Sequence, residues 1–493
     1  DQMGHILERT ASSTNIKERR DFSCGVFDSD GGLIASAPHI PVHLGAMGES
    51  VKSVLKTRGP SMSPGDVLLT NDPFNGGSHL PDITVVSPFF DKDGKKILFL
   101  VASRGHHADI GGTSPGSMPA NSQNIAEEGI LFENEFLMRK GVFLEEEIGK
   151  KLKSGPYPAR NITENIADLK AQVAANNKGI DELKEVLGEY GPGMVTMYTR
   201  FIQQNAEEAV RRVIGKLEPG RFIDSLCVQI SVDKKNRSAT IDFSGTSKQS
   251  PGNMNAPVAV TYAAVIYVFR TLIDEKIPLN SGFLAPFTIL IPDDSLLNPK
   301  NPAAVAGGNV EVSMRLVDVL YGALKTMGAG QGTMNNFTFG NERVQYYETI
   351  AGGTGAGDGF DGESGVHTHM TNTKITDPEI LEWKYPVTLH EFSFRKKSGG
   401  SGKYRGGNGL KRHVEFHEEM EVGILSDRRK AEPYGMSGGG PGALGKNLLL
   451  RKNGELEKLK GKVSLKVLPG DAIIIETPGG GGFGKELKSD PRF

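Results

Sequence analysis

The stretch "DITVVSPFFDKDGKKILFLVASRGHH" (residues 82–107) contains two apolar segments that flank a short polar turn. Branched and aromatic residues dominate both segments, and "DKDG" between them is a strong turn signal, so the pattern predicts a β-hairpin. Two adjacent histidines follow the second strand directly. Functional residues often occupy loops at the ends of rigid strands, which makes this position the first candidate for a site.

The sequence before this hairpin predicts more β-structure. The segment "DFSCGVFDSDGGLIAS" (21–36) places two apolar runs around "DSDGG", which is typical of a second hairpin. Residues 1–17 and 45–58 carry apolar residues at helical spacing. We therefore expect residues 1–140 to form a mixed α/β region that contains the histidine pair.

The remainder of the chain changes character twice. Residues 141–218 are highly charged, with apolar residues at helical period and with Asn161 or Thr163 as candidate N-caps, and this pattern predicts a helical subdomain. Residues 219–384 mix strand and helix patterns. Residues 385–493 alternate short apolar runs with glycine turns and predict a β-rich region. The predicted fold class is α+β, with several subdomains and mostly antiparallel strands.

Composition excludes several classes of protein. The 493 residues exceed what one hydrophobic core usually supports, so we expect about two to four subdomains. Lys plus Arg total 57 and Asp plus Glu total 59, and the net charge of −2 gives no reason to expect nucleic acid or an anionic membrane as partner. Cys24 and Cys227 are the only cysteines, which excludes a disulfide framework and a Cys-rich zinc site.

The expected location is the cytoplasm. No apolar run reaches the roughly 20 residues that a membrane-spanning helix needs. The amino-terminal segment "DQMGHILERT" has no basic-then-apolar signal pattern. The sequence also lacks the G-x-x-x-x-G-K-[ST] pattern of a phosphate-binding loop, so we assign no ATP-binding role to this chain.

The segment "GGSHLPDI" brings a histidine and a carboxylate close together. His79 and Asp82 are three residues apart across a proline, on a loop that its glycines make flexible. Imidazole nitrogen and carboxylate oxygen suit Zn, Mn or Fe, and the third and fourth ligands are expected from His106 or His107 and from Asp21. The alternative is that His79 caps a turn and Asp82 is an Asx-turn residue. Spacing alone leaves both interpretations open.

The two adjacent histidines should have different roles. Neighbouring residues of an extended strand face opposite ways, so one of His106 and His107 can bind a metal while the other packs or binds substrate. Asp109 is a candidate for orienting a ligating imidazole, for ligating itself or for capping the loop. His367 and His369, in "GVHTHMTNT", would share one face of a strand, either as metal or substrate contacts or as packed residues.

Longer blocks of the sequence carry a resemblance to a known family. They are "NDPFNGGSHLPDITVVSPFF", "RGHHADIGG" with "SPGSMP", "EEGI", "AGGTGAGDGFDGESGVHTHMTNTKITDPEILEWKYP" and "TPGGGGFG". Over residues 3–485 the chain resembles the hydantoinase B/oxoprolinase family, and the block around "HTHMTNT" is most similar to its oxoprolinase branch. Family members that read "HW" in place of "HH" keep the first histidine. The resemblance thus implies a metal centre with Asp21, His79, Asp82 and His106 as ligands.

The resemblance also implies a division of labour between two subunits. An A-type partner would bind ATP and phosphorylate the carbonyl oxygen of a lactam or imide. This B-type chain would hold a divalent metal (Zn, Mn or Fe) and complete the hydrolysis, with Asp109 and His107 as catalytic candidates. A substrate that bears a carboxylate requires a cation, which makes Arg104 a candidate for a substrate contact. His369 is the second candidate, because the "HTHMTNT" block carries the resemblance to the oxoprolinase branch.

The favoured activity is that of a 5-oxoprolinase, which converts 5-oxo-L-proline, ATP and water into L-glutamate, ADP and phosphate. Hydrolysis of hydantoin or N-methylhydantoin is the alternative within the family, followed by a subunit of an acetone- or acetophenone-type carboxylase. A non-catalytic scaffold for the A-type partner is an alternative of a different class, and it predicts that no metal is bound.

Overall fold

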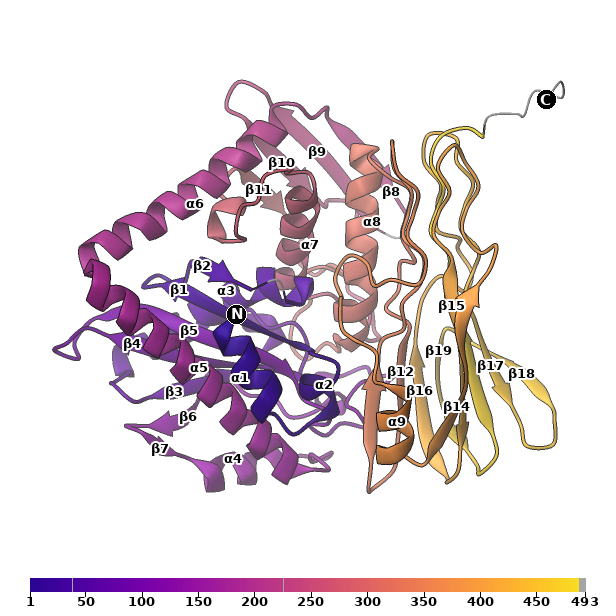
Figure 1. Ribbon diagram of the computed structural model, residues 1–493, viewed down its shortest axis with the longest axis horizontal. Coiled ribbons are helices and arrows are strands. Elements are labelled where there is room, and N and C mark those ends of the chain that lie inside the picture. The colour runs from indigo at the N-terminus through magenta and orange to yellow at the C-terminus, as the bar shows by residue number, and fades with distance from the viewer. Residues whose placement is uncertain (38, 225, 487–493) are drawn as a thin grey trace.

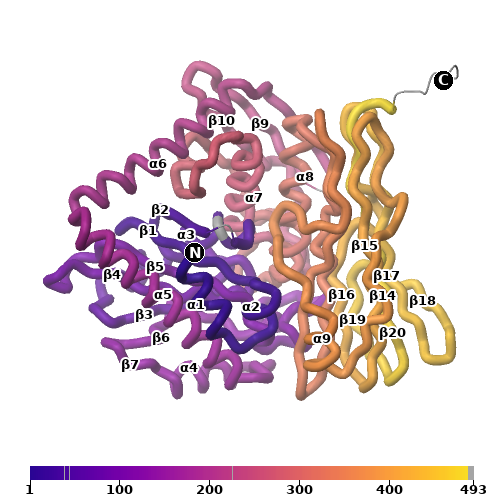
Figure 2. The backbone as a smooth tube through the Cα atoms, viewed as in Figure 1, coloured from indigo at the N-terminus to yellow at the C-terminus, as the bar shows by residue number. Residues whose placement is uncertain are grey.

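The computed structural model describes residues 1–37, 39–224 and 226–486, which fold into four β-sheets with covering helices (Figure 1). The carboxy-terminal strands stand as a separate slab beside the mixed layers formed by the rest of the chain (Figures 1 and 2). The α+β prediction is confirmed, since all named strand pairs of the described residues except one are antiparallel. No helix in the described ranges combines the length and apolar character that a bilayer crossing requires.

The hairpin predicted over residues 82–107 forms the centre of a seven-stranded antiparallel sheet. β4 (Asp82–Phe90) and β5 (Ile97–His106) pair along their length, and the register sets Asp82 opposite His106. The strand order is β2-β1-β5-β4-β3-β6-β7. The remaining bounds are β1 (Phe22–Asp28), β2 (Leu33–Ser36), β3 (Val67–Thr70), β6 (Glu135–Arg139) and β7 (Val142–Phe143).

Helices cover both faces of this sheet, which explains why its central strands are apolar at nearly every position. α3 (Pro41–Arg58) packs on the face that contains Val86, and α5 (Ile162–Tyr190) packs on the face that contains Val85. Successive residues of a strand therefore belong to two different hydrophobic cores. Over residues 82–89 and 99–106 the even-numbered side chains face α3 and the odd-numbered side chains face the opposite side of the sheet.

The predicted helical segment 141–218 contains α4 (Glu145–Leu152), α5 and α6 (Pro192–Ile214). The side chain of Asn161 caps α5 by accepting a hydrogen bond from the backbone N–H of Glu164, so the first of the two candidate caps is confirmed. Gly191 separates α5 from α6 with a φ of 76°, a conformation that favours glycine. The helices before β1 are α1 (Gln2–Thr10) and α2 (Thr14–Lys17).

A second, four-stranded sheet packs with α7 (Val258–Thr271) and α8 (Ser313–Leu324). α7 also crosses α3 so closely that a Cβ on Gly45 would lie only 2.3 Å from the Cα of Ala263. A π-helical turn (Gly308–Val312) leads into α8. The sheet has the order β11-β10-β9-β8, with β8 (Gly220–Ile223), β9 (Cys227–Asp233), β10 (Ser238–Asp242) and β11 (Phe287–Leu290), and β10 with β11 is the parallel pair.

The carboxy-terminal part packs two antiparallel sheets around a shared core, with α9 (Pro378–Lys384) beside them. The first sheet has the order β13-β12-β16-β19, with β12 (Asn336–Gly340), β13 (Gln345–Glu348), β16 (Met420–Leu425) and β19 (Lys462–Val467). The second has the order β14-β15-β20-β17-β18, with β14 (Val387–Arg395), β15 (Gly409–Phe416), β17 (Lys446–Leu450), β18 (Leu456–Leu459) and β20 (Ala472–Glu476). The β-rich region thus also includes two strands from before residue 385, and the subdomain boundaries stay a prediction.

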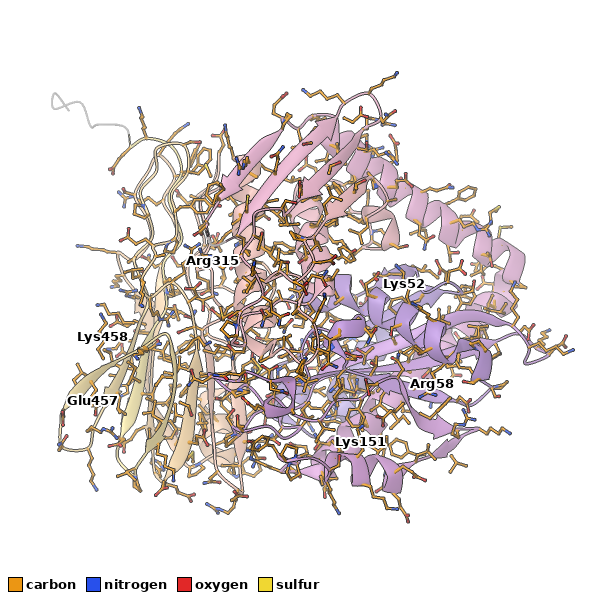
Figure 3. All side chains as sticks on the ribbon, turned by 180° about the vertical axis from the view of Figure 1, so that it is seen from behind. Lys52, Arg58, Lys151, Arg315, Glu457 and Lys458 are labelled. Atoms are coloured by element: carbon orange, nitrogen blue, oxygen red, sulfur yellow. The ribbon has the colours of Figure 1, made fainter. Side chains whose placement is uncertain are left out.

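Ion pairs join α8 to the carboxy-terminal part, and the pair between Arg428 and Asp318 is fully buried. Arg315 of α8 pairs with Asp224 and, over 3.2 Å, with Asp427, and Figure 3 shows it beside the carboxy-terminal sheets. Arg428 pairs with Asp318 of α8 over 3.0 Å. Breaking a buried pair leaves an uncompensated charge, so these contacts oppose any displacement of the two parts.

Candidate metal centre

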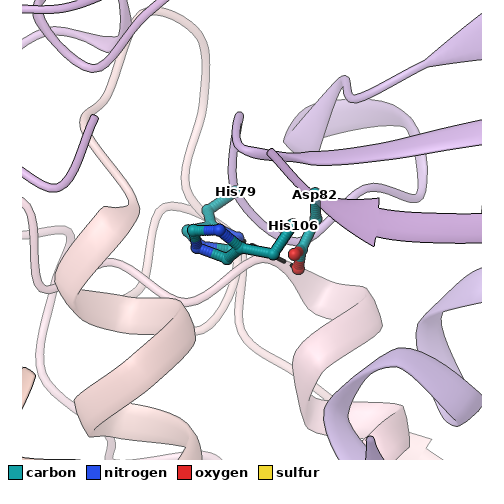
Figure 4. Close-up of side chains that lie close together, drawn as sticks. All are labelled: His79, Asp82 and His106. Atoms are coloured by element: carbon teal, nitrogen blue, oxygen red, sulfur yellow. Dashed lines mark ion pairs between the residues drawn. The ribbon is translucent and has the colours of Figure 1, made fainter. Parts of the chain in front are cut away.

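His79, Asp82 and His106 lie together where β4 begins and β5 ends (Figure 4). Asp82 and His106 are cross-strand partners, and His79 lies three residues before Asp82 in the turn that enters β4. Antiparallel pairing sets the first residue of one strand beside the last residue of the next, so one strand end gathers side chains distant in sequence. One nitrogen or oxygen of each side chain lies within 4.8 Å of the others.

A small buried cavity adjoins these side chains. Its volume of about 20 Å³ has room for one water-sized particle. Its lining comes from the central sheet, from α3 and the segment before it, from the π-helical turn and from loops and strands near residues 334–371. The lining residues are Asp21, Ile40, Val42, His43, His79, Asp82, His106, Asn309, Val310, Met334, Tyr347, Thr349, Met370 and Thr371.

Three polar atoms of the group have no hydrogen-bond partner. They are Nε2 of His79, Oδ1 of Asp82 and Nε2 of His106, and all three are shielded from solvent. An unpartnered buried polar atom costs about 1–3 kcal/mol, and such atoms are usually satisfied by a protein group, an ordered water or a bound ion. Two imidazoles and a carboxylate form a donor set that suits Zn, Mn or Fe. The residues present therefore fit the divalent metal that the sequence predicts.

The remaining polar atoms of His79 and Asp82 already have partners. Nδ1 of His79 lies 3.0 Å from Oδ2 of Asp82, and Oγ of Ser78 donates to the same oxygen over 2.6 Å. The side-chain nitrogen of Asn309, in the π-helical turn, lies 3.1 Å from Nδ1 of His79. In the tautomer that carries its hydrogen on Nδ1, the lone pair is on Nε2, which is the atom without a partner.

The ring of His106 is held from several sides. Its Nδ1 lies 3.1 Å from the carbonyl oxygen of His107 and 3.0 Å from the side-chain nitrogen of Asn15. Tyr347 stacks on the ring at a centroid distance of 4.7 Å and an angle of 16°. Contacts of this kind fix the tautomer and the orientation of metal-bound histidines in proteins.

The local electrostatics favour the protonation states that bind a metal. Burial opposes ionisation of Asp82, but His43 and His79 beside it hold the pKa of that carboxyl well below its usual value. Burial, reinforced by His79, holds the pKa of His106 well below its usual value. An ionised carboxylate and a neutral imidazole are the forms that coordinate metals.

Asp21, the fourth predicted ligand, lines the same cavity but is not among the three residues whose ligand atoms converge. Its backbone carbonyl accepts a hydrogen bond from the N–H of His106 over 3.0 Å, and its carboxylate lies 3.8 Å from Arg19. Burial raises the pKa of Asp21, although Arg19 partly offsets this effect. Its role as a ligand stays a prediction.

His107 faces away from the cavity, as the alternation of the strand requires. Its Nε2 lies 3.1 Å from Oε1 of Gln172, and its Nδ1 lies 3.3 Å from the side-chain nitrogen of Asn165, both on α5. His106 has the opposite parity and lies on the α3 side with the cavity. The contacts of His107 serve the packing of α5, and the catalytic role proposed for it stays a prediction without a contact that supports it.

Asp109 also lies outside the cavity lining. It accepts hydrogen bonds from Nη1 of Arg160 over 2.8 Å and from the backbone N–H groups of Gly111 and Gly116. Burial raises its pKa, and Arg160 partly offsets that effect. Asp109 therefore holds the loop after β5 in shape, which was one of the alternatives considered for it, and no contact supports its predicted catalytic role.

The two predicted substrate contacts lie apart from the cavity lining. Arg104 is buried in the α3 face of the sheet, where it donates to Thr84 over 2.7 Å and to Ser50 over 2.8 Å. Burial lowers the pKa of Arg104 to about 10. His369 is buried with its Nε2 3.1 Å from Oδ1 of Asp318. These partners are structural, and a contact of either residue with substrate stays a prediction.

His43 is a site residue to which the sequence pattern assigned no role. Its Nε2 lies 3.2 Å from Oδ2 of Asp82, and its Nδ1 lies 3.2 Å from Oγ of Ser23. The unusual density of histidines between residues 39 and 107 is the signal that could have revealed it. Asn309 and Tyr347 have no such signal, because they reach the site from segments more than 200 residues away in the chain.

Comparison with known proteins identifies relatives over almost the whole chain. The family model described as hydantoinase B/oxoprolinase matches residues 1–486. The chain is 48% identical to 5-oxoprolinase 1 of Arabidopsis thaliana and 46% identical to the 5-oxoprolinase of Dictyostelium discoideum, over 99% of this chain in both cases. It is 27% identical, over 99% of its length, to a Pseudomonas protein named as a D-/L-hydantoinase component and covers 88% of that protein.

Two further facts define the relationship. The chain spans only 41% of the Arabidopsis protein and 39% of the Dictyostelium protein. The crystal structure of an ATP-dependent caprolactamase from Pseudomonas jessenii has the same fold, with a TM-score of 0.89, 24% identity, and coverage of 98% of this chain and 88% of that one. With the family model matching from the first residue to residue 486, the chain belongs to the hydantoinase B/oxoprolinase family.

Proposed function

We propose that this chain is the hydrolytic B-type component of an ATP-dependent cyclic amidase and that it holds a divalent metal at His79, Asp82 and His106. The observation that carries the proposal is the set of three unpartnered ligand atoms around one small cavity. A non-catalytic scaffold gives no reason for three potential metal ligands to converge beside one cavity without protein partners.

The residues that line the proposed metal centre have different roles. His79, Asp82 and His106 would hold the ion, and we propose Asp21 as the fourth protein ligand. A divalent ion supplies Lewis-acid chemistry and activates water at neutral pH when it is bound. His43 keeps Asp82 in place and ionised, and the buried lining excludes bulk water from the reacting groups.

ATP would enter the reaction through an A-type partner. The carbonyl of a lactam is a poor electrophile, and phosphorylation of its oxygen turns that oxygen into part of a phosphate leaving group. We assign this step to the partner because this chain lacks a phosphate-loop pattern and matches only about two fifths of relatives named 5-oxoprolinase. The active assembly would then be a heteromer of A-type and B-type chains.

The preferred substrate in this proposal is 5-oxo-L-proline, with L-glutamate, ADP and phosphate as products. The identity of 46–48% to relatives named 5-oxoprolinase supports this choice over the 27% identity to the relative named as a hydantoinase component. Hydantoins and the substrates of acetone-type carboxylases are the alternatives that an activity assay must exclude.

The activity assay uses this chain co-purified with an A-type subunit. ADP release and glutamate formation are measured with 5-oxoproline and with hydantoin, for the wild type and for His79→Ala. We expect ATP turnover with 5-oxoproline that the variant lacks. Turnover with hydantoin alone would reject the oxoprolinase assignment, and equal turnover by His79→Ala would reject the site.

Elemental analysis of the chain tests the metal centre independently of activity. We expect His106→Ala to lose the metal, because this residue belongs to the converging group and its Nε2 has no partner, and His107→Ala to retain it, because its ring contacts α5. An unchanged metal content in both His106→Ala and His79→Ala would refute the assignment. A wild-type chain without metal after metal supplementation would favour the scaffold.

A further inference from the structure

The cavity beside His79 and His106 is too small for an organic substrate. Its volume of about 20 Å³ suits one water-sized particle, whereas pockets for small organic molecules typically start near about 300 Å³. A cyclic amide that reacts at this cavity must therefore have most of its bulk in a neighbouring space.

A larger pocket lies against the wall of this cavity, and we call it the α7 pocket. Its volume is about 380 Å³, which is within the range of small-molecule sites. One side of it is a face of α7, and the facing side is formed by the segment that enters α3 and by the loop after α7. The α7 residues in its lining are Ala263, Ile266, Tyr267, Arg270 and Thr271.

Two chain segments form a common wall between the cavity and the α7 pocket. His39 lines the α7 pocket, whereas the next residue, Ile40, lines the cavity. In the second segment Asn372 lines the pocket, whereas Met370 lines the cavity. The side chain of Asn372 donates to the carbonyl oxygen of His39 over 3.2 Å and joins the two segments. Neighbouring residues of the same two segments therefore line both spaces.

The α7 pocket combines apolar walls with one cation. Ile266, Ile277 and Leu279 supply apolar surface, and Arg270 is half-buried among them. Nη1 of Arg270 donates to the carbonyl of Ile273 over 3.1 Å, and no ion pair joins Arg270 to a carboxylate within the described ranges. A planar guanidinium with free donors beside apolar surface is suited to a carboxylate on a small, otherwise apolar molecule.

The remaining polar groups of the pocket are neutral. Burial lowers the pKa of His39 to about 4, so its ring carries no charge at pH 7. The hydroxyl oxygen of Tyr267 accepts a hydrogen bond from the backbone N–H of His369 over 3.1 Å, which leaves the hydroxyl hydrogen for another acceptor. The pocket thus offers one positive charge and a neutral hydrogen-bond donor to its occupant.

We propose that the α7 pocket binds a small cyclic amide that bears a carboxylate, and that Arg270 pairs with this carboxylate. 5-Oxoproline has this chemistry, with one carboxylate on a lactam ring whose methylene groups suit the apolar walls. The choice of a cyclic amide rests on the proposed function, whereas the recognition of a carboxylate rests on the pocket alone. Arg270 then takes the role of specificity-determining cation that the sequence suggested for Arg104.

The test compares two ligands that differ only in the carboxylate. Binding of L-5-oxoproline and of 2-pyrrolidinone, the same ring without the carboxylate, is measured by ligand-observed NMR on the metal-loaded chain. Arg270→Gln should weaken 5-oxoproline binding about tenfold or more, because a charge-assisted contact is lost, and should leave 2-pyrrolidinone binding unchanged. Arg270→Lys should retain part of the affinity.

The control variant is Arg221→Gln, which removes an exposed arginine on β8 and should alter neither affinity. Equal 5-oxoproline affinity in the wild type and Arg270→Gln would overturn the proposal. An equal loss for both ligands, with a lowered melting temperature, would also overturn it, because the pocket itself would then have changed.

Kinetics of the assembled A-type and B-type enzyme separate this inference from the proposed function. A raised KM for 5-oxoproline in Arg270→Gln, with little change in kcat, supports both. Selective loss of 5-oxoproline binding in an assembly that never hydrolyses it keeps the carboxylate site and rejects the function. Hydrolysis with an unchanged KM in the variant keeps the function and rejects the site.

Discussion

Two of the buried histidine–aspartate pairs among the described residues, His79–Asp82 and His369–Asp318, have similar distances but differ in how completely protein groups surround the aspartate. Nδ1 of His79 lies 3.0 Å from Asp82, and Nε2 of His369 lies 3.1 Å from Asp318. The second oxygen of Asp318 accepts from Arg428 over 3.0 Å, whereas the second oxygen of Asp82 has no partner. Protein groups close the cluster around Asp318 and leave the group around Asp82 open.

This difference separates a structural pair from a binding site better than the residue types do. In the closed cluster the carboxylate charge is balanced by a buried arginine, so the contacts fix the position of α8. In the open group the unpartnered atoms are a carboxylate oxygen of Asp82 and one ring nitrogen each of His79 and His106. Such atoms can coordinate a cation. α8 and its π-helical turn connect the two, because Asn309 contacts His79 and Asp318 contacts His369.

The strongest way to break the comparison is to remove one histidine from each pair. In the proposed enzyme His79→Ala should lose the metal and at least about 1,000-fold of the hydrolytic rate, which is ~4 kcal/mol of transition-state stabilisation. His369→Ala should retain the metal and lower the melting temperature. Elemental analysis and glutamate formation are the measurements. Metal loss in His369→Ala with retention in His79→Ala would reverse the two assignments.

A second prediction concerns the charge in the closed cluster. Asp318→Asn leaves the Arg428 guanidinium buried beside a neutral amide, which should destabilise the fold by about 3 kcal/mol. Urea unfolding followed by circular dichroism would show the loss, while the metal content stays unchanged. In the metal-free protein Asp82→Asn should cost clearly less, because no lysine or arginine of the described residues forms an ion pair with that carboxylate. Equal losses in both variants would contradict the distinction.

A third prediction tests whether His43 supports Asp82 in the open group. His43 holds Oδ2 of Asp82 without belonging to the three converging ligands, so His43→Phe should weaken metal binding by about 10–100-fold. Competition with a chromophoric chelator measures this affinity. The control is His390→Phe, because His390 is an exposed residue on β14 that pairs with Glu415. An unaltered affinity in His43→Phe would show that Asp82 needs no support.

Local pattern predicted the central hairpin, limited the α5 cap to Asn161 or Thr163, and placed His79 and Asp82 near His106 or His107. The reason is that a strand has a period of two and an antiparallel hairpin has a fixed register, so residues at its open end must meet. The same parity explains why His106 faces the α3 side and His107 faces α5. The sequence contained this information, and the resemblance to a family selected among its alternatives.

Contacts between distant segments were beyond such reasoning. Asn309 contacts His79 from the π-helical turn that precedes α8, and Tyr347 stacks on His106 from β13 of the carboxy-terminal part. The inclusion of β12 and β13 in the carboxy-terminal sheets follows from a register that pairs Asn336 with Leu425. Strand pairing over such separations depends on how whole layers pack together, and the local sequence pattern does not predict it.

The smallest expected effect concerns a histidine outside both pairs. His367 lies two residues before His369, its Nδ1 is buried without a partner, and burial, aided by Arg19, lowers the pKa of His367 from its ordinary value of 6.5 to about 3. The unfolded chain therefore takes up the proton first as the pH falls. The stability linked to this residue is complete above pH 6.5 and is lost progressively as the pH falls from 6.5 towards about 3.

His367→Gln should remove this part of the acid sensitivity. Between pH 6.5 and 5.5 the wild type should lose roughly 1 kcal/mol more stability than the variant, since one pKa unit corresponds to about 1.4 kcal/mol and the ring is only partly enclosed. Melting temperatures across this range provide the measurement, with the exposed His417→Gln as control. Identical pH profiles for the wild type and His367→Gln would show that His367 takes up its proton equally well in the folded protein. The loss of stability at low pH would then have to come from other histidines with a lowered pKa, such as His106 in the open group.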